Sequence, residues 1–222
     1  MRILLALLAG AVLLAACGSS KNRASTKATS EPLITADPRL LVLPADQLPA
    51  PFTAKDGSIV SAQWSRSWDR DPNDSAATGA TRVTINAVLE QTVAQAVSDF
   101  DSNYGGSNGQ TYAQRAIQAR GFQPAQIKVA PADVGSLGVD QQEAVRVEFT
   151  RGTAEASYVQ YFVYMRVRNT LAQVTAFAQN KDGAEAPKLL DDLKSVAKKQ
   201  ADHLRSLPVE TLSAPSPARR SP

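Results

Sequence analysis

Residues 158–167 read Tyr-Val-Gln-Tyr-Phe-Val-Tyr-Met-Arg-Val and predict a strand with a well-filled face on each side. Alternate positions of a strand point to opposite sides, so Val159, Tyr161, Val163, Met165 and Val167 share one face. Tyr158, Gln160, Phe162, Tyr164 and Arg166 share the other. Residues 144–151 and 171–178 also alternate, and Gly152-Thr153 and Asn169 mark the reversals. The three segments predict an antiparallel meander.

Outside this meander the sequence predicts a mixture of strands and helices. Val83, Ile85 and Ala87 alternate with Arg82, Thr84 and Asn86, which predicts a half-buried strand, and residues 59–68 predict another. Thr92 and Gln95 form a capping-box pattern ahead of a helix that ends at Gly105, and residues 111–120 predict a second helix closed by Gly121. Leucines from Leu189 to Leu207 recur at helical spacing. We therefore expect one α+β domain over residues 38–212: a largely antiparallel sheet with helices packed on one face and a long C-terminal amphipathic helix.

The face of the 158–167 strand that carries Tyr158 is more aromatic than an ordinary solvent-exposed face. Tyr158, Phe162 and Tyr164 are therefore candidates for a partner surface. The alternative is that both faces are internal, with this one covered by the N-terminal loop that contains Phe52. Trp64 and Trp68 either line the same surface or fill the core.

The N-terminus has the parts of a secretory signal. Positive charge at Met1-Arg2 precedes an apolar stretch from Ile3 to Leu14, which is shorter than the roughly 20 residues that span a bilayer. The run Leu14-Ala15-Ala16-Cys17 contains the only cysteine of the chain and resembles the lipobox of bacterial lipoproteins. The resemblance implies cleavage of a signal peptide, residues 1–16, and acylation of Cys17. A plain secretory signal with an incidental cysteine is the alternative.

The lipobox resemblance implies a location as well. Two or three acyl chains anchor a protein stably, so we expect a membrane-bound protein whose folded part lies outside the cytoplasm. Gly18 follows the cysteine where an aspartate would retain many lipoproteins in the inner membrane, so the anchor is expected in the cell membrane or the outer membrane. Residues 17–37 predict a flexible lipidated tether, and residues 213–222 a disordered tail.

Charge excludes a nucleic-acid-binding class for the folded part. The chain carries 24 Lys and Arg against 21 Asp and Glu, but the surplus lies in the tails, at Arg2, Lys21, Arg23, Lys27, Arg219 and Arg220. The remaining domain is slightly acidic. A nucleic-acid footprint requires basic residues clustered on a folded face.

A serine hydrolase is the enzymatic alternative. Gly105-Gly106-Ser107-Asn108-Gly109 matches the G-x-S-x-G pattern, and His203 lies downstream. The context argues against it, because a nucleophile elbow follows a strand, whereas here a helix is predicted before the serine. The sequence therefore assigns no catalytic residue.

Metal and cofactor sites lack their ligands. Asp69, Asp71 and Asn73 match the first ligands of a calcium loop, but Asp74 replaces the turn glycine and Ala80 the bidentate glutamate. The chain has one histidine and one cysteine, too few for a zinc or haem motif, and no nucleotide phosphate loop. Asn73-Asp74-Ser75 matches a glycosylation acceptor. We expect no metal and no cofactor.

The order of elements over residues 40–207 resembles the small α+β domains of PsbP-like bacterial lipoproteins. That resemblance implies a non-catalytic role in the cell envelope and transfers no site. The expected function is a membrane-anchored binding or assembly module. The rival is a carrier of a lipid or another hydrophobic ligand, which would need an apolar cavity.

Overall fold

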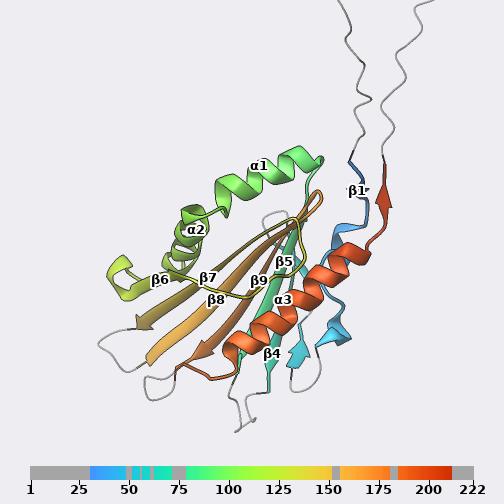
Figure 1. Ribbon diagram of the computed structural model, residues 1–222. Coiled ribbons are helices and arrows are strands. Elements are labelled where there is room, and N and C mark those ends of the chain that lie inside the picture. The colour runs from blue at the N-terminus through green and yellow to red at the C-terminus, as the bar shows by residue number, and fades with distance from the viewer. Residues whose placement is uncertain are drawn as a thin grey trace, which may run out of the picture.

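The computed structural model describes residues 31–48, 52–55, 57–60, 63–71, 79–151, 156–180 and 185–211. The predicted signal peptide, Cys17, the tether before residue 31 and the tail over 213–222 lie outside these residues, as does the Asn73-Asp74-Ser75 motif. Figure 1 shows one sheet between helices. The strands are β1 Leu33–Ile34, β2 Phe52–Ala54, β3 Ser58–Val60, β4 Gln63–Arg70, β5 Arg82–Leu89, β6 Ile127–Pro131, β7 Gln141–Arg151, β8 Ala156–Val167, β9 Thr170–Gln179 and β10 Val209–Glu210. The α-helices are α1 Val93–Asn103, α2 Ser107–Gln118 and α3 Leu189–Ser206, and short 3-10 turns occupy Pro38–Leu40, Ala45–Gln47 and Pro124–Gln126.

The main sheet has eight strands in the order β2-β4-β5-β9-β8-β7-β6, with β3 paired to β4. All of its pairs are antiparallel. The predicted meander is confirmed as β7, β8 and β9, which are neighbours in that order. The fold is thus α+β with a large antiparallel sheet.

Helices cover both faces of this sheet, so the expectation that they pack on one face is wrong. Val159, Val163 and Met165 of β8 lie in one apolar cluster with α3. Phe162 and Tyr164 of the same strand lie in a second cluster with α1 and α2. The two clusters lie on opposite sides of the sheet (Figure 1) because successive residues of β8 point to opposite faces.

Helix α3 buries an apolar stripe on the first face of the sheet. Its buried residues include one polar side chain, Gln200, which is fully buried. The Gln200 side chain accepts from Leu43 N at 3.1 Å and donates to Leu41 O at 2.7 Å. These bonds hold the buried segment Leu41 to Leu43 against the helix. The other buried residues of α3 are Leu189, Leu193, Val196, Ala197, Ala201 and Leu204.

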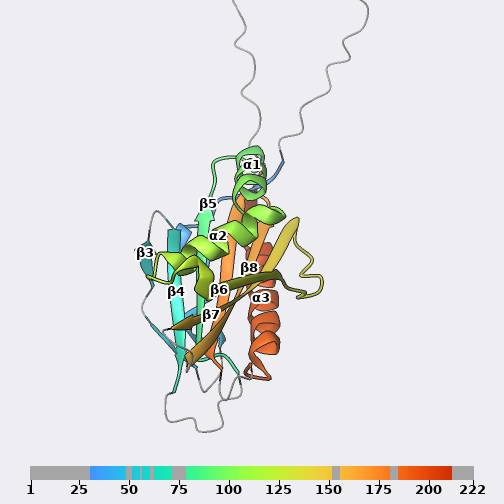
Figure 2. The same cartoon turned by 90° about the vertical axis from the view of Figure 1, so that its left-hand side faces the viewer.

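Helices α1 and α2 lie on the second face, and Figure 2 views the molecule from their side. The predicted cap of α1 is confirmed, because Thr92 Oγ1 accepts from Gln95 N at 3.0 Å. Helix α2 begins at Ser107, earlier than predicted. A Cβ on Gly109 would collide with the carbonyl oxygen of Tyr104, so glycine allows the two helices to meet closely there.

The segment predicted as one strand over residues 59–68 is two strands that pair with each other. Val60 of β3 is the partner of Gln63 of β4, and Ile59 is the partner of Trp64. Directly paired residues share a face, so Ile59 lies on the face of Trp64, whereas one unbroken strand would place these two residues, five positions apart, on opposite faces.

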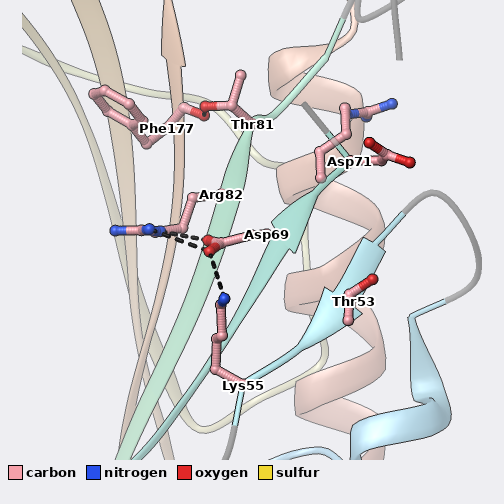
Figure 3. A pocket seen from close by; sticks show the side chains of 8 residues that line it. Thr53, Lys55, Asp69, Asp71, Thr81, Arg82 and Phe177 are labelled. Carbon is pink, nitrogen blue, oxygen red and sulfur yellow. Dashed lines mark hydrogen bonds and ion pairs between the residues drawn. The ribbon is translucent and has the colours of Figure 1, made fainter. Parts of the chain in front are cut away.

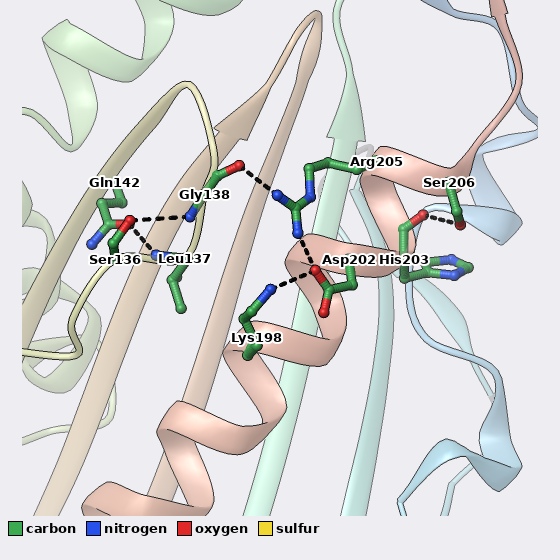
Figure 4. A network of polar contacts seen from close by, with 9 residues as sticks. All are labelled: Ser136, Leu137, Gly138, Gln142, Lys198, Asp202, His203, Arg205 and Ser206. Atoms are coloured by element: carbon green, nitrogen blue, oxygen red, sulfur yellow. Dashed lines mark hydrogen bonds and ion pairs between the residues drawn. The ribbon is translucent and has the colours of Figure 1, made fainter.

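Both ends of the described chain leave the domain at one end (Figure 1). Strand β1 pairs with β10, with Leu33 opposite Glu210. Nearby, Arg205 at the end of α3 donates to Gly138 O at 2.9 Å and contacts Asp202, which also pairs with Lys198 at 2.7 Å (Figure 4). This network ties the end of α3 to the loop before β7.

Candidate functional site

The aromatic side chains of β8 belong to the core. Phe162 and Tyr164 are 1% and 0% exposed beneath α1 and α2, and Tyr164 stacks on Tyr104 with ring centroids 4.4 Å apart. The partner surface expected at these two residues is therefore wrong, and Tyr158 is half-buried beside them. The cover comes from α1 and α2, whereas Phe52, Trp64 and Trp68 pack on the opposite face with α3.

The same sheet face becomes polar where α1 and α2 no longer cover it. Across β4, β5 and β9 the register aligns Asp69 with Arg82 and Phe177, and Ser67 with Thr84 and Thr175. Directly paired residues of neighbouring strands share a face, so these side chains form rows on the side of Phe162. A third row is formed by Ser65, Asn86 and Gln173. We call the surface made by these three rows the polar half of the sheet.

A groove of about 600 Å³ lies at one end of the polar half (Figure 3). A second pocket of about 340 Å³ shares Arg82 and Phe177 with it, so the two are neighbours. A third, of about 260 Å³, shares Arg120 with the second. The groove is lined by Thr53, Lys55, Asp69, Arg70, Asp71, Thr81, Arg82 and Phe177, and the second pocket by Arg82, Thr84, Arg120, Gln160, Thr175 and Phe177.

Asp69 lies between two cations in the groove (Figure 3). Arg82 Nε donates to Asp69 Oδ1 at 2.6 Å and Arg82 Nη2 to Oδ2 at 3.2 Å, while Lys55 Nζ lies 3.6 Å from Oδ2. The hydrogen bonds from Arg82 are the main cause of the lowered pKa of Asp69, and the same bonds raise the pKa of Arg82.

Arg120 reaches the second pocket from the end of α2. Gly121 has a φ of 92°, which confirms the left-handed position predicted from the sequence and turns the chain directly after Arg120. Arg120 Nη1 donates to Gln160 Oε1 at 2.8 Å. Partial burial, and next the charge of Arg82, lower the pKa of Arg120. An arginine keeps its proton despite such a shift, so two like charges face the same pocket.

Sequence analysis missed these two arginines. The alternation of Arg82, Thr84 and Asn86 predicted a wet face, but nothing in it indicated that β9 would lie beside β5. Arg120 and Gln160 are 40 residues apart and meet only in the folded chain.

Ser107 and His203 are placed on different sides of the molecule. Ser107 opens α2, which packs on the second face, directly after the α1–α2 turn. His203 lies on α3, which packs on the first face, and its Nε2 lies 2.7 Å from Leu40 O. A helix, α1, precedes Ser107, as the sequence predicted, whereas a nucleophile elbow follows a strand.

The residues that match the start of a calcium loop are only partly described by the structure. Asp69 is held by Arg82, and Asn73 lies outside the described residues. Within the described ranges, no three His, Cys, Asp or Glu residues are grouped so that they could hold a metal ion. In the same part of the chain, no helix has the length and apolar character needed to cross a bilayer.

No protein-family model matches the chain, and no curated protein matches it.

Proposed function

We propose that this protein is a lipid-anchored lipoprotein of the bacterial cell envelope whose domain binds a ligand or partner through the polar half of its sheet. The observation that carries the binding role is the groove. It lies on a sheet face that is half covered by helices and half open, with charged and hydroxyl side chains over the open part. Ligand sites are concave and use a few convergent polar groups to orient the ligand.

The proposed location rests on the sequence Leu14-Ala15-Ala16-Cys17. An acylated Cys17 would join the domain through the segment that leads into β1. The groove residues Thr53, Lys55 and Asp69 lie on strands of the main sheet or directly beside them. They are not part of the small β1–β10 sheet. A tether attached at β1 therefore leaves the groove open to the envelope space.

A non-catalytic role is proposed because no catalytic set is assembled around Ser107 among the described residues. The PsbP-like architecture suggested by the sequence is part of the same proposal. The rival proposal of a lipid carrier is less well supported, because the groove and its two neighbouring pockets are lined largely by Arg, Lys, Asp, Thr and Gln side chains.

Two experiments test the proposal. In the native host, Cys17→Ala is expected to move the protein from the membrane fraction to the soluble fraction, while Ser19→Ala, which leaves the lipobox intact, keeps it in the membrane. Equal membrane content of both variants would contradict the anchor.

The binding surface is tested by photo-crosslinking in the same host. A benzoylphenylalanine at Thr84, which lines the second pocket beside the groove, is expected to give an adduct of discrete mass. The matched control replaces Ser195, which is exposed on the outer side of α3. Equal labelling from both positions would contradict a binding role for the groove.

A further inference from the structure

We propose that Arg82 and Arg120 bind one phosphate-class anion in the pocket beside the groove. We call this site the arginine pocket; it is the second pocket described above, of about 340 Å³. The inference deepens the proposed function and rests on it, because it names the chemistry of the ligand that the groove would take.

The lining of the arginine pocket is one-sided in charge. Arg82 and Arg120 contribute two guanidinium groups, and no Asp or Glu is among the described residues that line it. Thr84 adds a hydroxyl group, whereas the hydroxyl of its direct partner Thr175 donates to Thr84 O at 3.5 Å. The two guanidinium groups and the Thr84 hydroxyl can donate hydrogen bonds to an oxyanion.

The sheet register places the two arginines on either side of Phe177. Arg82 is the direct partner of Phe177, and Phe177 is the direct partner of Gln160, to which Arg120 is bonded. Strands β5 and β8 are two positions apart in the sheet, or about 10 Å. Long arginine side chains that approach from both ends of this row can contact one anion between them.

Each arginine has donors left for a ligand. Arg82 uses Nε and Nη2 on Asp69, and within the described residues its Nη1 makes no hydrogen bond. Arg120 uses Nη1 on Gln160, and its Nε and Nη2 have no acceptor in the same described ranges. Both residues are exposed, so the donors are accessible from solvent.

The electrostatic state of the pocket favours an anion. Two protonated guanidinium groups line one pocket and repel each other, and the charge of Arg82 adds to burial, the larger cause, in lowering the pKa of Arg120. A bound anion would replace this repulsion by two charge-assisted interactions.

The number of donors favours a phosphate group over a carboxylate. A carboxylate is satisfied by one guanidinium fork, as Asp69 is by Arg82. A tetrahedral phosphate presents oxygens in several directions and can accept from both arginines and from the Thr84 hydroxyl at once.

Asp69 acts as a built-in competitor for the anion. It occupies two donors of Arg82 and carries a negative charge beside the pocket. Removal of this charge should strengthen anion binding, whereas removal of either arginine should weaken it. If these residues had only a structural role, the substitutions would not be expected to change the anion affinity in opposite directions.

The test is isothermal titration calorimetry of the full mature chain, purified in an uncharged detergent and in phosphate-free buffer. The first probe is inorganic phosphate, and the second is dihexanoyl phosphatidylglycerol, a soluble phosphodiester headgroup. We expect Arg120→Met to weaken binding of both probes roughly tenfold or more, Arg120→Lys to weaken it less, and Asp69→Asn to tighten it several-fold. The matched control is Arg115→Met, an exposed arginine earlier on α2 that lines none of the three pockets.

The two probes distinguish the source of the phosphate. Tighter binding of the phosphodiester assigns the pocket to a headgroup or another phosphodiester, and tighter binding of inorganic phosphate assigns it to a free phosphate group. Near-ultraviolet circular dichroism identical to that of the unsubstituted chain shows that each variant is folded. The inference is overturned if neither probe binds, or if Arg120→Met and Arg115→Met bind equally well.

Failure of this inference is distinguishable from failure of the proposed function. Crosslinking from Thr84 without phosphate binding would support the proposed binding role and contradict the proposed phosphate-class ligand. Loss of both would remove the groove as a binding site.

Discussion

Arg120 Nη1 donates a hydrogen bond to Gln160 Oε1 at 2.8 Å and so joins the end of α2 to the middle of β8. The acceptor side chain is only 3% exposed. The contact has two consequences: it holds a cation at the arginine pocket, and it satisfies a buried amide.

The Arg120→Met substitution is expected to lower the free energy of unfolding by about 1–2 kcal/mol, because the buried Gln160 amide loses its partner. The double substitution Arg120→Met with Gln160→Leu is expected to cost less than Arg120→Met alone, since no polar group then remains unpaired. Urea denaturation of the three chains measures both values. A double variant that is less stable than either single variant would contradict this role.

Tyr164 has a hydroxyl group that is buried with no hydrogen-bond partner among the described residues. Burial is the main cause of its raised pKa. We expect Tyr164→Phe to leave the free energy of unfolding unchanged or to raise it by up to about 1 kcal/mol, because an unpaired polar atom is removed.

Tyr161, which lies on the other face of β8, is the matched control. Its hydroxyl donates to Glu185 Oε1 at 2.7 Å, and its pKa is raised to about 12, chiefly by burial. Tyr161→Phe is expected to cost about 1 kcal/mol. Thermal unfolding in which Tyr164→Phe is the more damaging change would contradict the assignment.

Gln200 fixes the N-terminal segment against α3. Gln200→Met leaves Leu43 N and Leu41 O, both in buried residues, without this partner. The expected loss is roughly 2–4 kcal/mol, from two unsatisfied backbone groups. Ser195→Ala on the exposed side of the same helix is expected to change stability by less than about 0.5 kcal/mol. Equal denaturation midpoints for the two variants would argue against this cost.

Acid stability reports on the Asp69–Arg82 pair. The pKa of Asp69 is lower in the folded chain than in the unfolded chain, so its contribution to stability is present above about pH 4 and is lost as the pH falls through the lowered pKa. Asp69→Asn is therefore expected to flatten the stability profile below about pH 4. The same substitution made in an Arg82→Gln chain should have little effect there. If the Asp69→Asn chain keeps a profile as steep as that of the unsubstituted chain, the pair is excluded as its source.

The central strands were predictable because their signal is local. Residues 158–167 alternate without interruption, and Asn169 marks the turn that β8 and β9 share. The cover of the aromatic face was not predictable, because α1 and α2 reach Tyr164 from more than 40 residues away in the chain, and no periodicity records which face a helix will choose. The arginine pocket escaped prediction for the same reason: Arg82, Arg120 and Gln160 come from three separate parts of the chain.

The account depends first on the lipid at Cys17, since it places the groove in the envelope. Mass spectrometry of the N-terminal peptide of the protein from its native host tests this most directly. The account predicts a chain that begins at Cys17 and carries a diacylglyceryl thioether. A chain that retains residues 1–16, or that carries an unmodified thiol at Cys17, would contradict it.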